Sequence, residues 1–115
     1  MAETKQYISQ AQENGNVLIS EDVIATIVSH AVSEVEGVAG LGSIPKRAWG
    51  KGVKITISPN NKLTIECYVI VYYGQSVFDV AKAVQVAIGN AIQAMTGAKV
   101  NSINVNVSGI IRKDK

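Results

Sequence analysis

The feature that most constrains the fold is a ten-residue run, LTIECYVIVY, at residues 63–72. Apolar side chains occupy every second position of this run, from Leu63 to Val71. Strict alternation places these side chains on one face of a β-strand, and that face must be buried against another layer. A shorter alternating run, residues 53–57, precedes it, and the sequence Pro59-Asn60-Asn61 between the two favours a turn. The two runs are therefore predicted to pair as a hairpin.

Two amphipathic helices are predicted, one before and one after this hairpin. The first starts at Ser20, an N-cap residue followed by two carboxylates in the first turn, and continues with apolar residues at helical spacing. The second runs from about Ser76 to Met95. A glycine follows each helix, Gly37 and Gly97 respectively, and is predicted to end it in the left-handed conformation.

Three short apolar runs complete the predicted elements. Residues 16–19 and 103–107 are predicted as a first and a last strand, and residues 38–41 as a brief extended segment. Two helices can cover only one face of such a sheet. The predicted fold is an α+β two-layer sandwich in the order β-α-β-β-α-β, with both helices packed on one face of a small, mostly antiparallel sheet.

The length of 115 residues suits a single domain, and 47% hydrophobic with 17% charged residues is the composition of a globular protein. We expect residues 1–15 to form a flexible polar N-terminus, residues 16–111 the domain, and residues 112–115 a charged tail. No run approaches the length of a membrane span, and the N-terminus lacks the apolar region of a secretion signal. Together with the single cysteine, Cys67, these features predict a cytoplasmic protein.

Residues for catalysis or metal binding are sparse. The only histidine, His30, precedes Glu34 by four residues on the first helix, and an ion pair between them is expected. Cys67 falls on the core face of its strand, where it behaves as a small hydrophobe. The glycines of GVAGLG, residues 37–42, follow a helix instead of opening one, so they do not match a phosphate-binding loop. We therefore expect no catalytic residues, no cofactor and no metal site.

The most unusual segment is GSIPKRAWGKG, residues 42–52, which holds the only tryptophan, Trp49, among Lys46, Arg47 and Lys51. Burying a tryptophan removes roughly 150–250 Å² from water, so an exposed one calls for a covering partner. Even four basic residues attract an anionic membrane at only about 1 kcal/mol each, which is too weak for a stable anchor. We expect the loop to be mobile and Trp49 to be exposed until a protein partner binds. Packing of the loop on its own domain is the alternative.

Two further surfaces are candidates for contact with other molecules. Tyr68 and Tyr72 project from the sheet face away from the core, where another subunit would cover them. RNA-recognition domains stack bases on aromatic side chains placed there, so RNA binding by these tyrosines and the basic loop is the alternative. Val86 lies on the outward face of the second helix among few charges, which favours self-association.

Four stretches occur together in a characteristic order: ISEDVIATIVSHAVSEVEGVAGL, GKGVKI, YVIVYYGQSVFDVAKAVQ and MTGAKVNSINVNVSGI. In this combination the chain resembles the alkaline shock protein family, the Gls-type envelope stress proteins of Gram-positive bacteria, over residues 16–111. The resemblance implies a cytoplasmic, non-enzymatic protein of general stress and envelope homeostasis. It also implies assembly with itself and with membrane-anchored partner proteins, which would hold it at the inner face of the membrane. Nucleic acid is not an expected partner.

Overall fold

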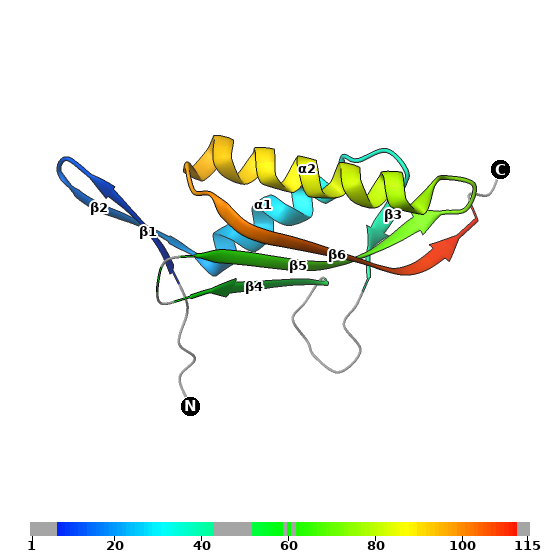
Figure 1. Ribbon diagram of the computed structural model, residues 1–115, viewed down its shortest axis with the longest axis horizontal. Helices are drawn as coiled ribbons and strands as arrows, with labels where there is room; N and C mark the ends of the chain where they lie inside the picture. The colour runs from blue at the N-terminus through cyan, green and yellow to red at the C-terminus, as the bar shows by residue number, and fades with distance from the viewer. Residues whose placement is uncertain (1–6, 43–51, 59, 61, 113–115) are drawn as a thin grey trace, which may run out of the picture.

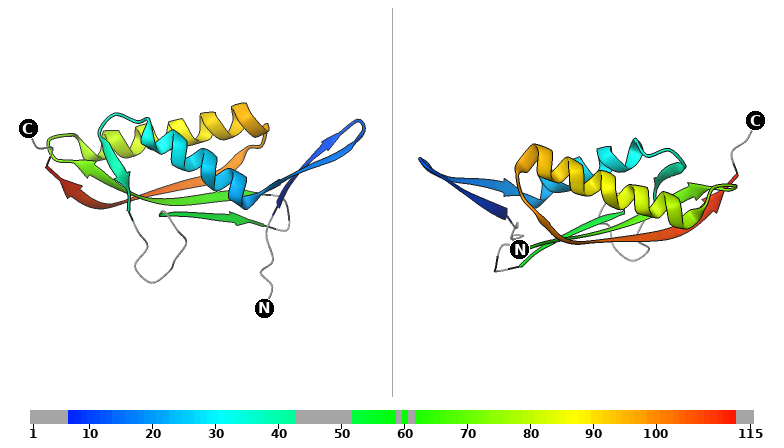
Figure 2. Two further views of the ribbon diagram at one scale, coloured as in Figure 1. Left: turned by 180° about the vertical axis from the view of Figure 1, so that it is seen from behind. Right: turned by 45° about the horizontal axis from the view of Figure 1, so that its top comes forward.

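The computed structural model describes residues 7–42, 52–58, 60 and 62–112, and arranges them as two helices on one face of a sheet, with a hairpin at one end (Figure 1). In chain order the elements are β1 (Tyr7–Gln12), β2 (Gly15–Ser20), α1 (Glu21–Ser33), β3 (Val38–Leu41), β4 (Val53–Ile57), β5 (Leu63–Tyr72), α2 (Val77–Thr96) and β6 (Val100–Ile111). Both helices lie on the same side of the main sheet, and no described helix covers its other face (Figure 2). The predicted two-layer α+β architecture is confirmed.

Serine caps start both helices; Ser20 was predicted as a cap, and Ser76 lies at the predicted start of the second helix. The hydroxyl oxygens of Ser20 and Ser76 accept hydrogen bonds from the backbone N–H groups of Val23 and Asp79, each at 3.4 Å. These bonds satisfy N–H groups that have no partner within the first turn of a helix. α2 ends at Gly97, which is left-handed with φ +77°, also as predicted.

The predicted end of α1 at Gly37 is wrong. The helix ends earlier, with Glu34 as its right-handed C-cap. Gly37 lies in the connection to β3, where its φ is +98° and its carbonyl accepts a hydrogen bond from Tyr72 N–H at 3.0 Å. A Cβ added to Gly37 would lie 2.9 Å from Val80 Cγ2. The glycine is therefore required by the close passage of this connection over α2, and not as a helix cap.

β5 is the central strand of the main sheet and pairs with all three of its other strands. β4 and β3 pair antiparallel with the first and second halves of β5, which confirms the predicted hairpin of β4 and β5. β6 runs parallel to β5, because α2 carries the chain back to the other end of the sheet. Ile65 pairs with both Ile55 of β4 and Ile103 of β6. β6 therefore occupies one edge of β5, and β4 occupies the other.

β3 and β4 meet end to end at Tyr68 of β5. The Gly42 N–H donates to the Tyr68 carbonyl at 2.6 Å, and the Tyr68 N–H donates to the Gly52 carbonyl at 2.9 Å. In an antiparallel ladder one residue usually exchanges both bonds with a single partner. Here two glycines share that position, so the segment 43–51 begins and ends at one point on the edge of the sheet.

Tyr7, the first described residue, already belongs to strand β1, so the prediction of a flexible segment over residues 1–15 is corrected for residues 7–12. β1 pairs antiparallel with β2 in a separate two-stranded sheet, which also removes residues 16–19 from the main sheet (Figure 1). Ile8 is 1% exposed and joins the core, against which Ile19 also packs. Among the described side chains of β1 only Ile8 is buried, so the sequence shows no alternation by which to recognise the strand.

The core lies between the main sheet and the helices. β5 buries the alternating residues predicted for it, Leu63, Ile65, Cys67, Val69 and Val71. The helices contribute Ile24, Ile27, Val28, Val32, Val80, Val84, Ile88 and Ile92. β6 is longer than the predicted 103–107, and its inward side chains are only partly buried because the strand lies at the edge of the sheet.

Candidate interaction surfaces

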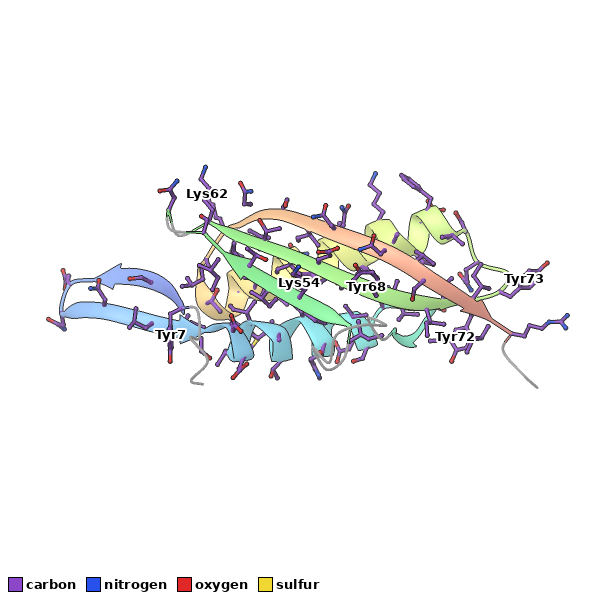
Figure 3. All side chains as sticks on the ribbon, turned by 90° about the horizontal axis from the view of Figure 1, so that it is seen from below. Tyr7, Lys54, Lys62, Tyr68, Tyr72 and Tyr73 are labelled. Atoms are coloured by element: carbon purple, nitrogen blue, oxygen red, sulfur yellow. The ribbon has the colours of Figure 1, made fainter. Side chains whose placement is uncertain are left out.

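The sheet face away from the helices carries both predicted tyrosines (Figure 3). Tyr68 lies near the middle of β5 and Tyr72 at its end, and both side chains are half-buried. The Tyr68 hydroxyl donates a hydrogen bond to Glu66 Oε2 at 3.0 Å. This hydrogen bond, in which the neutral phenol is the donor, is the main cause that raises the pKa of Tyr68 above its ordinary value.

This arrangement does not favour the RNA-binding alternative. The carboxylate beside Tyr68 repels phosphate groups. The two tyrosines stand four residues apart on one strand, roughly 13 Å, with Ile70 between them on the same face. β6 adds Asn104 and Asn106 opposite Glu66 and Tyr68. Tyrosine and asparagine side chains combine large contact area with adaptable hydrogen bonding, which suits contact with a protein.

Four of the predicted contact residues, Lys46, Arg47, Trp49 and Lys51, lie outside the described residues. Their predicted exposure therefore stays a prediction. The structure does define where their segment leaves and rejoins the sheet, at Gly42 and Gly52 beside Tyr68. The basic segment and the tyrosine face, which were separate candidates in the sequence, are thus attached at the same point of the fold.

Val86 lies on the outward side of α2 and is 55% exposed. It borders a groove of about 390 Å³ between α2 and the start of β6, whose lining includes Gly89 and Val100. The Gln85 side-chain N–H donates to the Ile103 carbonyl at 2.9 Å, which ties the helix to the strand. No described strand pairs with the outer edge of β6. The surface around Val86 therefore continues onto an open strand edge, which helical periodicity alone did not predict.

A second groove, of about 620 Å³, lies between the two helices. Its apolar lining is Ile27, Ala31, Val35, Ala87, Ala91 and Met95. No residue of the sheet lines it, so it lies on the outer surface of the helical layer. Met95 is 70% exposed there. On the rim, His30 Nε2 and Glu34 Oε2 lie 3.2 Å apart, which confirms the predicted contact between these two side chains.

Charged residues of the same sign are grouped in blocks along the chain, and this pattern is independent of hydrophobic periodicity. Between Lys5 and Lys46 all five charged residues are carboxylates, whereas between Glu36 and Glu66 all five are lysine or arginine. From residue 83 to residue 111 the single charge is Lys99. The first block contains α1, the second contains β4 and the segment 43–51, and the third forms most of α2 and all of β6. Of the second block, the described residues include Lys54, which pairs with Glu66 in the sheet, and Lys62.

Within the described part of the chain, no three His, Cys, Asp or Glu side chains are grouped so that they could hold a metal ion. The thiol of Cys67 is fully buried in the core. Burial, and to a smaller extent the nearby Glu66 carboxylate, raises its pKa to about 11. The thiolate is the reactive form of cysteine, so this thiol is held in its inert form.

Cys67 is expected to resist alkylation in the native protein. At pH 8, a pKa of about 11 leaves roughly one thiol in a thousand ionised, and the side chain is inaccessible as well. Iodoacetamide should therefore modify the native protein at least about 100-fold more slowly than the urea-unfolded chain. Mass spectrometry of timed samples measures both rates. Similar rates in the two states would mean that the sheet opens readily around β5.

In the described residues, neither helix has the length and apolar character needed to cross a membrane. Among solved structures, the fold is similar to that of MamM CTD, with a TM-score of 0.59 and 15% identity over 77% of this chain and 98% of that one. A copper form of a MamM CTD variant gives a TM-score of 0.58 at 15% identity, over 77% of this chain and 96% of that chain. At this identity the likeness concerns the fold alone.

The described residues form a small α+β domain with two helices on one face of a sheet. The chain belongs to the alkaline shock protein twenty-three family, which has a cell envelope-related function; the family model matches residues 9–112. The resemblance noted in the sequence is thereby confirmed.

Relatives of the chain occur in Gram-positive bacteria. YqhY of Bacillus subtilis is 35% identical over 105 residues, which cover 84% of this chain and 77% of that protein. Spy1535 of Streptococcus pyogenes is 30% identical over 103 residues, covering 84% of this chain and 80% of the relative. YloU of Bacillus subtilis is 27% identical over 107 residues, covering 84% and 88% of the two chains.

Proposed function

We propose that this protein is a non-enzymatic, cytoplasmic protein of stress response and envelope homeostasis, which acts by associating with itself and by binding membrane-associated partner proteins. The cell envelope-related function of its family supports this cellular setting. The tyrosine face and the surface around Val86 are aromatic and apolar, which supports binding to other proteins as the mode of action. Through such a partner the protein would lie at the inner face of the membrane.

The observation that carries this proposal is the low-charge surface formed by α2 and β6. Protein interfaces are depleted of charged residues at their centres. Asp79 and Lys82 lie near the start of α2, and from residue 83 to residue 111 Lys99 is the single charge. Soluble proteins usually protect an edge strand with charged side chains, a proline or a bulge that twists the edge away. Between Val100 and Ile111, β6 has neither charge nor proline, and the irregularities of its register against β5, at Asn101 and Ser108, are the one protection of this kind that it has. We therefore place self-association on this surface, with Val86 near its centre.

We assign the binding of partner proteins to the face of the sheet that points away from the helices. Tyr68 and Tyr72 supply aromatic area on the open sheet face, and Lys46, Arg47, Trp49 and Lys51 belong to the segment attached beside Tyr68. Basic residues alone bind an anionic bilayer weakly, so attachment through a protein is the more stable arrangement.

Val86→Glu is expected to weaken self-association at least tenfold. A carboxylate at the centre of an apolar interface would be buried without a partner, which costs about 1.4 kcal/mol or more. Sedimentation velocity over a concentration series measures the effect. Val23→Glu is the matched control, because Val23 is a similarly exposed helical valine (47%) on α1, away from this surface. A wild-type protein that stays monomeric at every concentration would exclude self-association.

Partner binding is tested separately from self-association. Tagged protein is expected in the membrane fraction of cells, while the purified protein should not bind vesicles of anionic phospholipid. Direct binding to the vesicles would mean that the protein binds the lipid surface itself and needs no protein partner.

A further inference from the structure

We propose that two copies of this chain pair β6 with β6 in antiparallel orientation, and that Phe78 of each copy enters the groove beside Gly89 of the other. This inference rests on the proposed self-association and gives it a geometry. The two copies would be related by a twofold axis perpendicular to the sheet, so that the sheet continues from one copy into the next and all helices stay on one face.

The edge formed by α2 and β6 is covered fully only by a partner that has two layers. α2 lies above β6 on the same side of the molecule (Figure 1, Figure 2). A single peptide strand could pair with β6, but it would leave the adjoining side of α2 uncovered, where Phe78 is 72% exposed. A second copy turned about a twofold axis presents β6 to β6 and α2 to α2 at the same height. The second copy is therefore the occupant that fits both layers.

The backbone of β6 is suitable for this pairing. The Ile103 carbonyl accepts the hydrogen bond from the Gln85 side chain, so it faces away from β5. Because the direction of hydrogen bonding alternates along a strand, the backbone groups of Val105 and Val107 face the same outer edge. A carbonyl oxygen can accept two hydrogen bonds, so Gln85 does not block pairing at Ile103. The strand carries no charge, so pairing with itself places no like charges opposite each other.

The side chains of α2 on this edge are complementary to one another in antiparallel order. Phe78, Lys82 and Gln85 line a groove of about 290 Å³ between α2 and β6, and Gln85 and Gly89 line the neighbouring groove of about 390 Å³. An axis between residues 83 and 84 places Phe78 opposite Gly89, and Lys82 opposite Gln85, of the second copy. The phenylalanine ring then meets the position without a side chain. Gln85 uses its Nε2 for Ile103, so its Oε1 can accept a hydrogen bond from the Lys82 ammonium of the second copy.

The strand leads to the same axis as the helix. Gln85 contacts Ile103 and lines a groove together with Val105, so the middle of α2 lies above Val105. An axis at Val105 pairs Ile103 with Val107 of the second copy. Both residues lie in the regular part of β6, between the irregularities at Asn101 and Ser108. One axis therefore serves both layers, and Val86 lies within one helical turn of it.

The area of this edge is sufficient for a stable pair. β6 has 12 residues, which gives an edge roughly 40 Å long at about 3.3 Å per residue. With a helix about 10–12 Å across above the strand, each copy would cover roughly 500–800 Å². A specific interface needs about 1,000 Å² in total from the two partners.

Disulfide cross-linking tests this geometry directly. Phe78→Cys and Gly89→Cys in one chain place two thiols 11 positions apart on α2, about 16 Å, which is too far for a disulfide within one copy. With oxidised glutathione, the double variant should form a covalent dimer as its main product, and Cys67 does not interfere because it is buried. Each single variant alone should stay uncross-linked, whereas a mixture of the two should give the dimer. Non-reducing electrophoresis, after free thiols are blocked, measures the products. Phe78→Cys with Val23→Cys, which adds an exposed position on α1, is the control and should give no dimer.

The fit of Phe78 into the groove is tested by changes of size. Phe78→Ala removes the ring and Gly89→Leu occupies the groove, so each should weaken self-association at least tenfold in sedimentation velocity. Gly89→Leu should leave the monomer folded, because Gly89 is helical and an added Cβ would meet only Ile103 Cδ1, at 3.6 Å. Met95→Ala is the matched control for Phe78→Ala. Met95 is 70% exposed on the same helix but lies in the groove between α1 and α2, so this variant should associate as wild type does.

Three results would overturn this inference. A wild-type protein that is monomeric at every concentration would exclude it together with the proposed self-association. Self-association that Val86→Glu weakens, without a cross-link between positions 78 and 89, would leave the proposed function standing and reject this geometry. A ladder of covalent oligomers in place of a dimer would mean that the copies associate head to tail and that no twofold axis relates them.

Discussion

Replacing Gly52 by alanine is expected to lower the free energy of unfolding by about 3–5 kcal/mol. Gly52 has φ +76°, where a residue with a Cβ is strained by roughly 1–3 kcal/mol. The added Cβ would also collide with the backbone carbonyl oxygen of Gly42. Relieving that collision disturbs the two hydrogen bonds that join Gly42 and Gly52 to Tyr68, each worth about 1 kcal/mol. Urea unfolding followed by circular dichroism measures the change.

Gly74→Ala is the matched control for this substitution. Gly74 has a comparable positive φ of +103°, but an added Cβ would meet no atom within 4 Å. Its cost should be limited to backbone strain, about 1–2 kcal/mol. Equal losses of unfolding free energy in the two variants would show that the Cβ added at position 52 does not collide with Gly42. The two glycines opposite Tyr68 would then be packed less closely than in the structure.

Ile8→Ala is expected to lower the free energy of unfolding by about 2–4 kcal/mol, because it removes a side chain that is fully buried in the core. The effect is diagnostic, since Ile8 lies in a stretch whose polar composition predicts a flexible tail. Thermal and urea unfolding of the full chain provide the measurement.

The control for Ile8 is another apolar residue of the same hairpin. Leu18 on β2 is 60% exposed, so Leu18→Ala should change the free energy of unfolding by less than about 0.5 kcal/mol. If Ile8→Ala were equally harmless, the hairpin would not be part of the folded domain. If both were costly, the exposed side of the hairpin would be covered in solution.

The elements that hydrophobic periodicity defines could be predicted from the sequence. β5 and the two helices each place several apolar residues on one face, and Ser20 caps the first helix as predicted. β1 could not be predicted, because its stability depends on pairing with β2 and on a single buried side chain, Ile8. The role of Gly37 was also out of reach, because it depends on how closely Val80 of α2 approaches.

Some parts of the candidate surfaces could likewise be predicted from the sequence, and others could not. The positions of Tyr68 and Val86 follow from the face of the strand and of the helix on which each lies. The groove between α1 and α2 depends on the packing of two elements that are distant in the sequence, so neither helix predicts it alone. The acidic and basic blocks are visible in the sequence, but only the fold shows that α1 and β4 lie in different layers.

The shared position of Gly42 and Gly52 opposite Tyr68 also makes this point of the fold suitable for inserting foreign sequence. In the turn between β4 and β5, the number of residues helps to set which residues pair, beginning with Ile57 and Leu63. Gly42 and Gly52, by contrast, each form their own backbone hydrogen bond with Tyr68. Residues added between them would therefore leave the pairing of β3 with β5 and of β4 with β5 unchanged. Doubling the length of a flexible loop costs only about 0.6 kcal/mol of closure entropy. An epitope or a labelling peptide could therefore be carried between these two glycines without rebuilding the sheet.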